Sequence, residues 1–141
     1  MKQFLGPQPL NTDVAALLLR LILGGLFFFI HGWQKIDNYQ QILPMFGDII
    51  GIGSKLSFNL VIFAEFFCAF LILVGLFTRL AVIPLLITMF IAYFVAHAKD
   101  DFQVKTLPFV YLWLCPVVFV LGSGKFSLDQ LLYKKKKNTD N

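Results

Sequence analysis

Charged residues are scarce in this sequence: Asp, Glu, Lys and Arg make up 14% of its 141 residues. A soluble domain normally carries about 25% charged residues, so this chain is not expected to fold as a soluble globular domain. Cysteine is also scarce, because Cys68 and Cys115 both lie inside apolar runs and no Cys-x-x-Cys pair occurs. Redox chemistry at a cysteine pair and a cysteine metal site are therefore not expected.

Apolar residues make up 58% of the chain, with seventeen Phe, and the mean hydropathy is +0.77. They gather in four runs that are each long enough to cross the hydrocarbon core of a bilayer. These predicted spans cover about residues 14–34, 57–77, 80–97 and 107–122. We therefore predict an all-α fold in which residues 1–141 form a single membrane domain, a bundle of four transmembrane helices.

Two further segments complete the predicted fold. Residues 36–56 are too apolar for a free loop and too short to span, so we expect an interfacial or re-entrant segment over one end of the bundle. Ser127-Leu128-Asp129-Gln130 is a capping-box pattern, which predicts a short C-terminal amphipathic helix. The basic tail that follows, residues 133–141, contains Lys134–Lys137, which suit an anionic lipid surface. No soluble domain accompanies this tail, so nucleic-acid binding is not expected.

The basic residues are divided unequally between the two ends of the predicted spans. With four spans both termini lie on one side, which then holds eight Lys and Arg, against four on the other side. Cytoplasmic loops carry an excess of Lys and Arg. The sequence therefore predicts a multi-pass protein of the bacterial cytoplasmic (inner) membrane with both termini in the cytoplasm.

Glu65 is a single carboxylate within the second apolar run. An ionised side chain at that depth costs several kcal/mol unless it is partnered. With a rise of 1.5 Å per residue, Glu65 lies about 12 Å below the outer end of its span. His31, Lys35 and His97 lie near the same outer end, so we predict a polar pocket built from these four residues and roofed by residues 36–56.

The residue types in this pocket suggest roles for each member. We assign Glu65 and His31 as catalytic, because a carboxylate in the membrane and an imidazole both exchange protons. Lys35, His97 and Tyr93 are expected to bind substrate. A structural ion pair of Glu65 with Lys35 or Arg79, and an interfacial His31 bonded to a backbone carbonyl, remain open alternatives. No metal site is expected, because no two of the candidate ligands share the i, i+3 or i, i+4 spacing.

Two arginines belong to the inner half of the predicted bundle. Arg20 lies on the same helical face as His31, since eleven residues are almost three whole turns. Arg79 follows the second span at a tight turn. We expect both to be structural or interfacial residues whose charged ends reach toward the headgroups.

Several short motifs occur in a fixed order along the chain. They are Leu19-Arg20-Leu21, His31-Gly32-x-x-Lys35, Ala64-Glu65, Gly75-Leu76-x-Thr78-Arg79, His97 and Gly122-x-Gly124-x-x-Ser127-Leu128-Asp129. In this order and spacing they resemble the DoxX family of small four-span bacterial membrane proteins, over about residues 14–132. One departure is that members often carry an acidic or polar residue early in the fourth span, where only Thr106 and Tyr111 are available here.

The resemblance implies a link to the membrane subunits of thiosulfate:quinone oxidoreductases. The protein would then be a redox-linked subunit, part of a quinone-linked oxidoreductase, whose outer pocket binds a quinone or a small thiol or sulfur compound. A quinone is the expected ligand, no cofactor is expected to be covalently bound, and a protein partner or a second copy is expected in the membrane. The alternative is a non-catalytic structural or assembly subunit of a larger envelope complex, and the residues do not decide whether the chain is an enzyme.

Overall fold

The computed structural model describes residues 11–139, with side chains through Lys135, and contains no strand among them. Four helices are long and apolar enough to cross a membrane: Thr12–Asp37, Ser54–Val74, Thr78–Ala96 and Phe102–Leu121. The predicted all-α bundle of four spans is therefore confirmed. Each helix begins two to five residues before the predicted apolar run, because polar residues continue the helix at the headgroup level, where hydropathy gives no signal.

Three of the four spans change helical type along their length. The first consists of α2 (Thr12–Gly25), the π-helical η1 (Leu26–Gly32) and α3 (Trp33–Asp37). The second consists of α5 (Ser54–Ile62), the π-helical η3 (Phe63–Cys68) and α6 (Ala69–Val74). The third joins α7 (Thr78–Ile91) to the π-helical η4 (Ala92–Ala96), and the fourth is the α-helix α8 (Phe102–Leu121).

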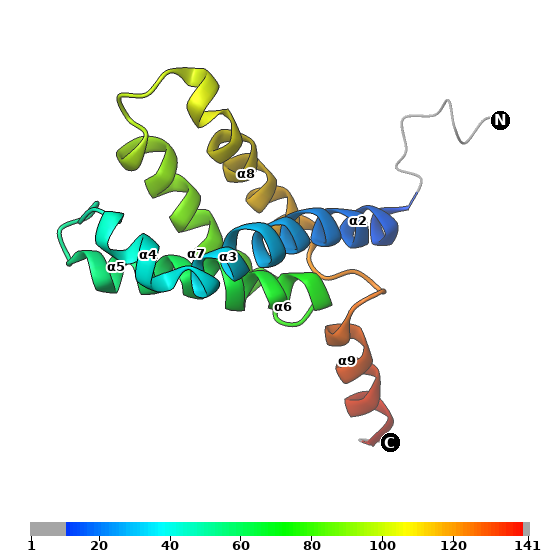
Figure 1. The fold of residues 1–141 in the computed structure, drawn as a ribbon. Coiled ribbons are helices and arrows are strands. Elements are labelled where there is room, and N and C mark those ends of the chain that lie inside the picture. The colour runs from blue at the N-terminus through cyan, green and yellow to red at the C-terminus, as the bar shows by residue number, and fades with distance from the viewer. Residues whose placement is uncertain (1–10, 140–141) are drawn as a thin grey trace.

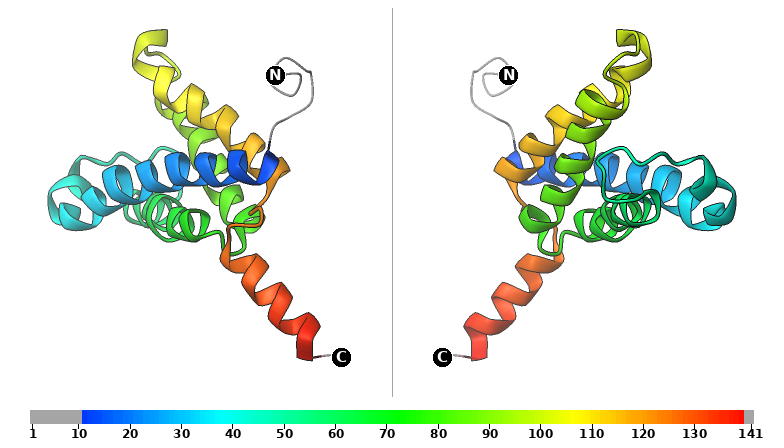
Figure 2. Two further views of the ribbon diagram at one scale, coloured as in Figure 1. Left: turned by 90° about the vertical axis from the view of Figure 1, so that its right-hand side faces the viewer. Right: turned by 90° about the vertical axis from the view of Figure 1, so that its left-hand side faces the viewer.

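The spans form two pairs, as Figures 1 and 2 show: the first span lies beside the second, and α7 lies beside α8. The pairs meet near the end at which α2 begins and α8 ends, and they diverge toward the opposite end. We call the first the terminal end, because α9 (Leu128–Thr139) also starts there, and the second the distal end. The divergence places the α7–α8 turn well away from α3 and α4.

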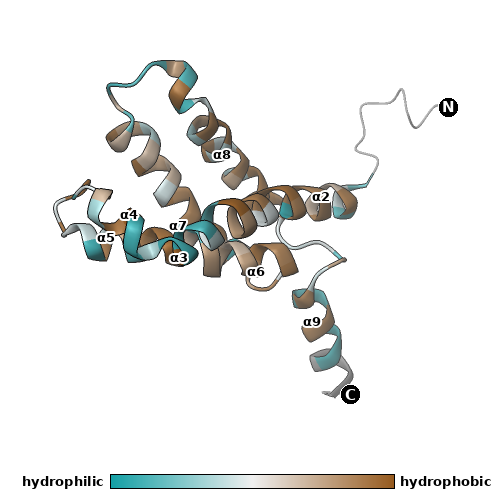
Figure 3. Ribbon diagram, viewed as in Figure 1, coloured by the Kyte–Doolittle hydropathy of each residue, from teal (hydrophilic) through white to brown (hydrophobic). Residues whose placement is uncertain are grey.

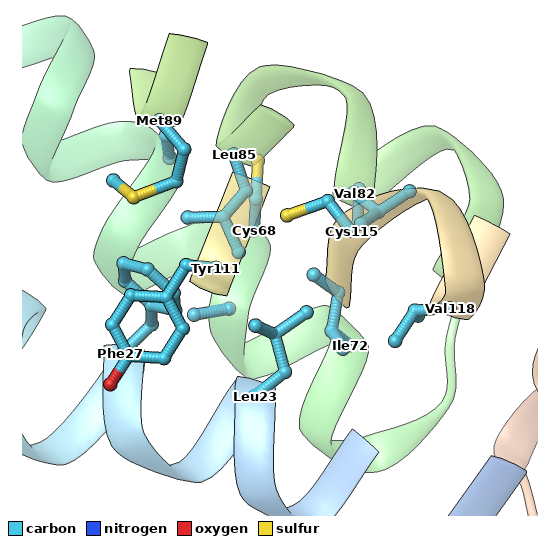
Figure 4. Close-up of a cluster of buried hydrophobic side chains, with 13 residues drawn as sticks. Leu23, Phe27, Cys68, Ile72, Val82, Leu85, Met89, Tyr111, Cys115 and Val118 are labelled. Carbon is cyan, nitrogen blue, oxygen red and sulfur yellow. The ribbon is translucent and has the colours of Figure 1, made fainter. Parts of the chain in front are cut away.

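The core fills the region where the two pairs meet (Figure 4). It consists of buried apolar side chains from all four spans, namely Leu23, Phe27, Ala64, Cys68, Ala69, Ile72, Ala81, Val82, Leu85, Met89, Tyr111, Cys115 and Val118. Both cysteines are buried in it as free thiols. Their role in the fold is therefore that of small apolar side chains.

The connection between the first two spans folds back over α5. It contains α4 (Tyr39–Ile42) and a short 3-10 turn, η2 (Leu43–Met45). The Tyr39 hydroxyl donates to Asn59 Oδ1 over 2.8 Å, and the ring of Tyr39 packs on Phe58 with 5.3 Å between ring centroids. This is the predicted segment. It packs against the bundle at the distal end, and it contains none of the four helices that are long and apolar enough to cross a membrane.

Apolar side chains also cover the outside of the spans, which Figure 3 shows as predominantly brown helices. Large apolar residues such as Phe29, Phe90 and Trp113 are exposed there, as expected for side chains that face lipid. The protein is thus a multi-pass membrane protein in contact with the bilayer. The predicted C-terminal helix is α9, whose side chains beyond Lys135, like residues 140 and 141 of the basic tail, lie outside the described residues.

Candidate functional site

Lys35 and Glu65 form an ion pair between α3 and η3. The ammonium of Lys35 donates a hydrogen bond to Glu65 Oε2. Glu65 is 5% exposed, whereas the Lys35 side chain is 22% exposed. The buried carboxylate is therefore partnered by a cation that still reaches the surface, which is the contact that its depth in the membrane requires.

Gly32 allows the two spans to approach closely enough for this pair. A Cβ atom at Gly32 would lie 2.5 Å from the carbonyl oxygen of Glu65 and 2.7 Å from Cα of Phe66. Gly24 makes a similar contact two turns earlier, where a Cβ atom would lie 2.7 Å from the backbone nitrogen of Leu73. Small residues at such crossings let membrane helices pack backbone against backbone.

The carboxylate of the ion pair lies in a π-helical turn, and a second π-helical turn lies opposite it. Glu65 belongs to η3, and Gly32 with its neighbour His31 belongs to η1. A π-helical turn leaves a wider ring of backbone than an α-helical turn, and such turns are rare and frequent at functional sites. Here two of them lie opposite each other, η1 in the distal half of the first span and η3 at the middle of the second.

His31 lies next to the ion pair along the first span and is half-buried. Its ring packs on Phe27, with 5.2 Å between centroids, and meets Tyr111 of α8 edge-on at 6.0 Å. Tyr111 also packs on Phe27 at 4.6 Å, and Figure 4 shows these two rings together in the core. The structure thus adds Tyr111, one of the two polar residues noted early in the fourth span, to the surroundings of His31.

His97 and Tyr93, which the sequence placed in the same pocket, have other partners. His97 Nδ1 lies 2.7 Å from Asp100 Oδ2, in the turn at the far tip of the α7–α8 pair (Figures 1 and 2). The Tyr93 ring packs on Phe109 at 5.5 Å, and the Lys105 ammonium lies 5.2 Å from its centroid. Among the described side chains, neither His97 nor Tyr93 forms a hydrogen bond with Glu65.

Arg20 and Arg79 lie at the terminal end, but only Arg79 has the exposure expected of a side chain that reaches toward the headgroups. Arg20 is 1% exposed, and its Nη2 donates to the carbonyl oxygen of Phe126. Arg79 is exposed, and its Nε donates to the carbonyl oxygen of Phe119 over 3.2 Å. Through these two carbonyl oxygens, both arginines connect the end of α8 and the loop that follows it to the rest of the bundle.

The chemistry available at the distal end is proton and hydrogen-bond chemistry. Glu65 offers a carboxylate, Lys35 an ammonium, and His31 an imidazole whose ring nitrogens make no hydrogen bond to another described residue. Within the described chain no three His, Cys, Asp or Glu residues gather closely enough to hold a metal ion. The candidate site is therefore the group Lys35, Glu65 and His31, with Tyr111 beside it.

Comparison with known proteins matches this chain to one protein family and to two relatives of similar length. The family model described as DoxX matches residues 15–98. A Bacillus subtilis protein named "Putative oxidoreductase CatD" is 30% identical over 130 residues, which cover 91% of this chain and 94% of that protein. An uncharacterized protein of Haemophilus influenzae is 26% identical over 134 residues, 90% of this chain and 89% of its own length. No solved structure gives a significant match.

Proposed function

Because this chain belongs to the DoxX family, we propose that it is a redox-linked membrane subunit whose site at the distal end binds a quinone or a small thiol or sulfur compound. The observation that carries this proposal is the Lys35–Glu65 ion pair, whose buried carboxylate lies in the π-helical η3, opposite the π-helical η1. A buried ion pair is a poor source of stability compared with an apolar contact. Its position in rare helical geometry favours a role in binding or proton transfer.

The residues of the site match what a quinone requires on reduction. Its carbonyl oxygens accept hydrogen bonds, which the Lys35 ammonium and an N–H of His31 would donate. Its reduction takes up two electrons and two protons, and Glu65 and His31 are groups that hold and release protons in this setting. The electrons would come from a protein partner, an oxidoreductase that docks on the bundle. The name of the Bacillus subtilis relative, "Putative oxidoreductase CatD", supports this direction.

Binding of a short-chain quinone analogue to the full chain in lipid nanodiscs tests the proposal. We expect Glu65→Gln to weaken binding about tenfold, because it removes the carboxylate that holds the Lys35 ammonium in place, and a hydrogen bond to a charged group contributes on that order. Asp100→Asn is the matched control, because Asp100 is an exposed acid that pairs with His97 at the tip of the α7–α8 turn. A wild-type chain that binds no analogue, or equal binding by both variants and wild type, would contradict a quinone site and leave the thiol or sulfur compound as the proposed ligand.

A non-catalytic structural or assembly role is the second candidate, and one observation favours it. Lys35 and Glu65 already satisfy each other, so the pair can serve solely to hold the first two spans in register. In that case Glu65→Gln lowers the amount of folded protein in the membrane and its recovery with a partner complex. Quinone binding per folded molecule would be the same for wild type and variant.

We also propose that the protein resides in the bacterial cytoplasmic membrane with its terminal end in the cytoplasm. The support is the excess of Lys and Arg at that end, eight against four, because such residues are retained on the cytoplasmic side. A green fluorescent protein fused after Asn141 is expected to fluoresce, and alkaline phosphatase fused there is expected to be inactive. The reverse pattern would overturn the orientation.

A further inference from the structure

A cavity of about 470 Å³ opens at the terminal end of the bundle. Its walls are formed by the first turns of α2, α7 and α9, the end of α8 and the loop of residues 122–125. Four charged residues line it: Asp13, Arg79, Lys125 and Asp129. This cavity is separate from the Lys35–Glu65 site, which lies at the distal half of the spans.

Both acids of the cavity already have partners. Asp13 Oδ1 accepts a hydrogen bond from the backbone N–H of Lys125 over 3.0 Å, and Asp13 Oδ2 lies 3.2 Å from Lys125 Nζ. Asp129 Oδ1 accepts from the backbone N–H of Phe77 over 2.9 Å. Neither acid forms an ion pair with Arg79 among the described side chains.

Arg79 is held in place but keeps unused donors. Its Nε is fixed by the carbonyl oxygen of Phe119, while its two terminal amino groups have no hydrogen-bond acceptor among the described residues. Gly122 leaves room beside the guanidinium, since a Cβ atom there would lie 3.3 Å from both Nε and Nη2. Gly122 also has a φ of +69°, which favours glycine. The result is an oriented guanidinium that borders a polar cavity.

We propose that this cavity binds a phosphate group, with Arg79 as its principal ligand. The planar fork of a guanidinium matches two phosphate oxygens. The N-terminal end of α7, at which Arg79 is the second residue, adds the positive end of the helix dipole. Arg79 is also the second residue of a membrane span, and the end of a span is where lipid headgroups are expected. The phosphate would come from a phospholipid headgroup or from a soluble phosphate, which share this chemistry.

Native mass spectrometry of the delipidated full chain tests the proposal. Wild type is expected to retain one dioleoylphosphatidylglycerol far better than dioleoylglycerol, which has the same acyl chains without phosphate. Arg79→Gln is expected to weaken retention about tenfold. Arg79→Lys should fall between them, because it keeps the charge and loses the fork. Lys99→Gln removes the same charge at the distal end and is expected to behave as wild type.

Competition with inorganic phosphate identifies the source of the phosphate. Displacement of the bound lipid supports a cavity that accepts the soluble anion, whereas retention supports a lipid headgroup as the ligand. Equal retention of the lipid by wild type and a folded Arg79→Gln variant would overturn the proposal. Equal binding of dioleoylglycerol and the phospholipid to wild type would overturn it without the use of any variant.

Discussion

Gly32 of the first span lies directly against the backbone of Glu65 in the second, so that any Cβ atom at Gly32 would lie 2.5 Å from the carbonyl oxygen of Glu65. The same crossing positions the Glu65 side chain for its ion pair with Lys35, three residues after Gly32. Packing and chemistry at this site therefore depend on one glycine. Neither span could rotate to relieve a larger side chain without separating the charged groups.

Substitution of Gly32 is expected to destabilise the protein. Gly32→Ala forces the two backbones apart, which should lower the free energy of unfolding by about 1–3 kcal/mol. Gly25→Ala is the matched control, because its Cβ atom would meet only Leu73 Cδ1 at 3.9 Å. Unfolding of the detergent-solubilised chain by increasing SDS measures both. Equal stability of the two variants would show that the crossing at Gly32 is not tight.

The ion pair is expected to respond unequally to loss of its two members. Lys35→Met leaves a carboxylate that is 5% exposed without its cation, which should cost about 3–5 kcal/mol. Glu65→Gln should cost less, since the Lys35 side chain is 22% exposed and can extend to the headgroups. In the double variant most of the loss caused by Lys35→Met should be recovered. A double-mutant cycle of SDS unfolding measures the coupling, and additive effects would contradict a direct pair.

Asp129 is expected to stabilise the turn between the second and third spans. Its carboxylate accepts from the N–H of Phe77, a residue with φ of +49°, and its own N–H donates to the carbonyl of Gly75 over 3.0 Å. Asp129→Ala removes the side-chain acceptor and should cost about 1–3 kcal/mol. Asp129→Asn, which keeps an acceptor oxygen, should cost less. Gln130→Ala is the control, and hydrogen exchange at the Phe77 amide is the direct readout.

The pairing of Glu65 with Lys35 could be predicted from the sequence, because the depth of each residue in its span follows from counting residues along the helix. A carboxylate about 12 Å from the end of its span needs a cation at a similar depth, and Lys35 ends the neighbouring span. The terminal end was also foreseeable as the location of Arg20 and Arg79. The distance of a residue from the end of its span follows from its place in the apolar run, which the hydropathy of the sequence shows.

Counting residues along a helix does not tell which other helices lie beside a given residue, and His97 is an example. It lies at the same predicted end as Lys35, but the α7–α8 pair diverges from the first two spans and carries His97 away with it. Similarly, an apolar run has no feature that distinguishes a π-helical turn from an α-helical one, so η1 and η3 were not predicted. The contact of Tyr111 with His31 depends on how α8 packs across the bundle, which the spacing of its residues alone does not determine.

His31 offers a test that separates chemistry from packing. Its ring contacts Phe27 at 5.2 Å and Tyr111 at 6.0 Å, and a phenyl ring in its place would keep both contacts. His31→Phe is therefore expected to change the free energy of unfolding by less than about 1.5 kcal/mol while it removes the ring nitrogens that would donate to a quinone oxygen. His31→Ala should lose stability as well as binding. If His31→Phe binds a quinone analogue as wild type does, the imidazole has a packing role and the proton-transferring group must be sought at Glu65 alone.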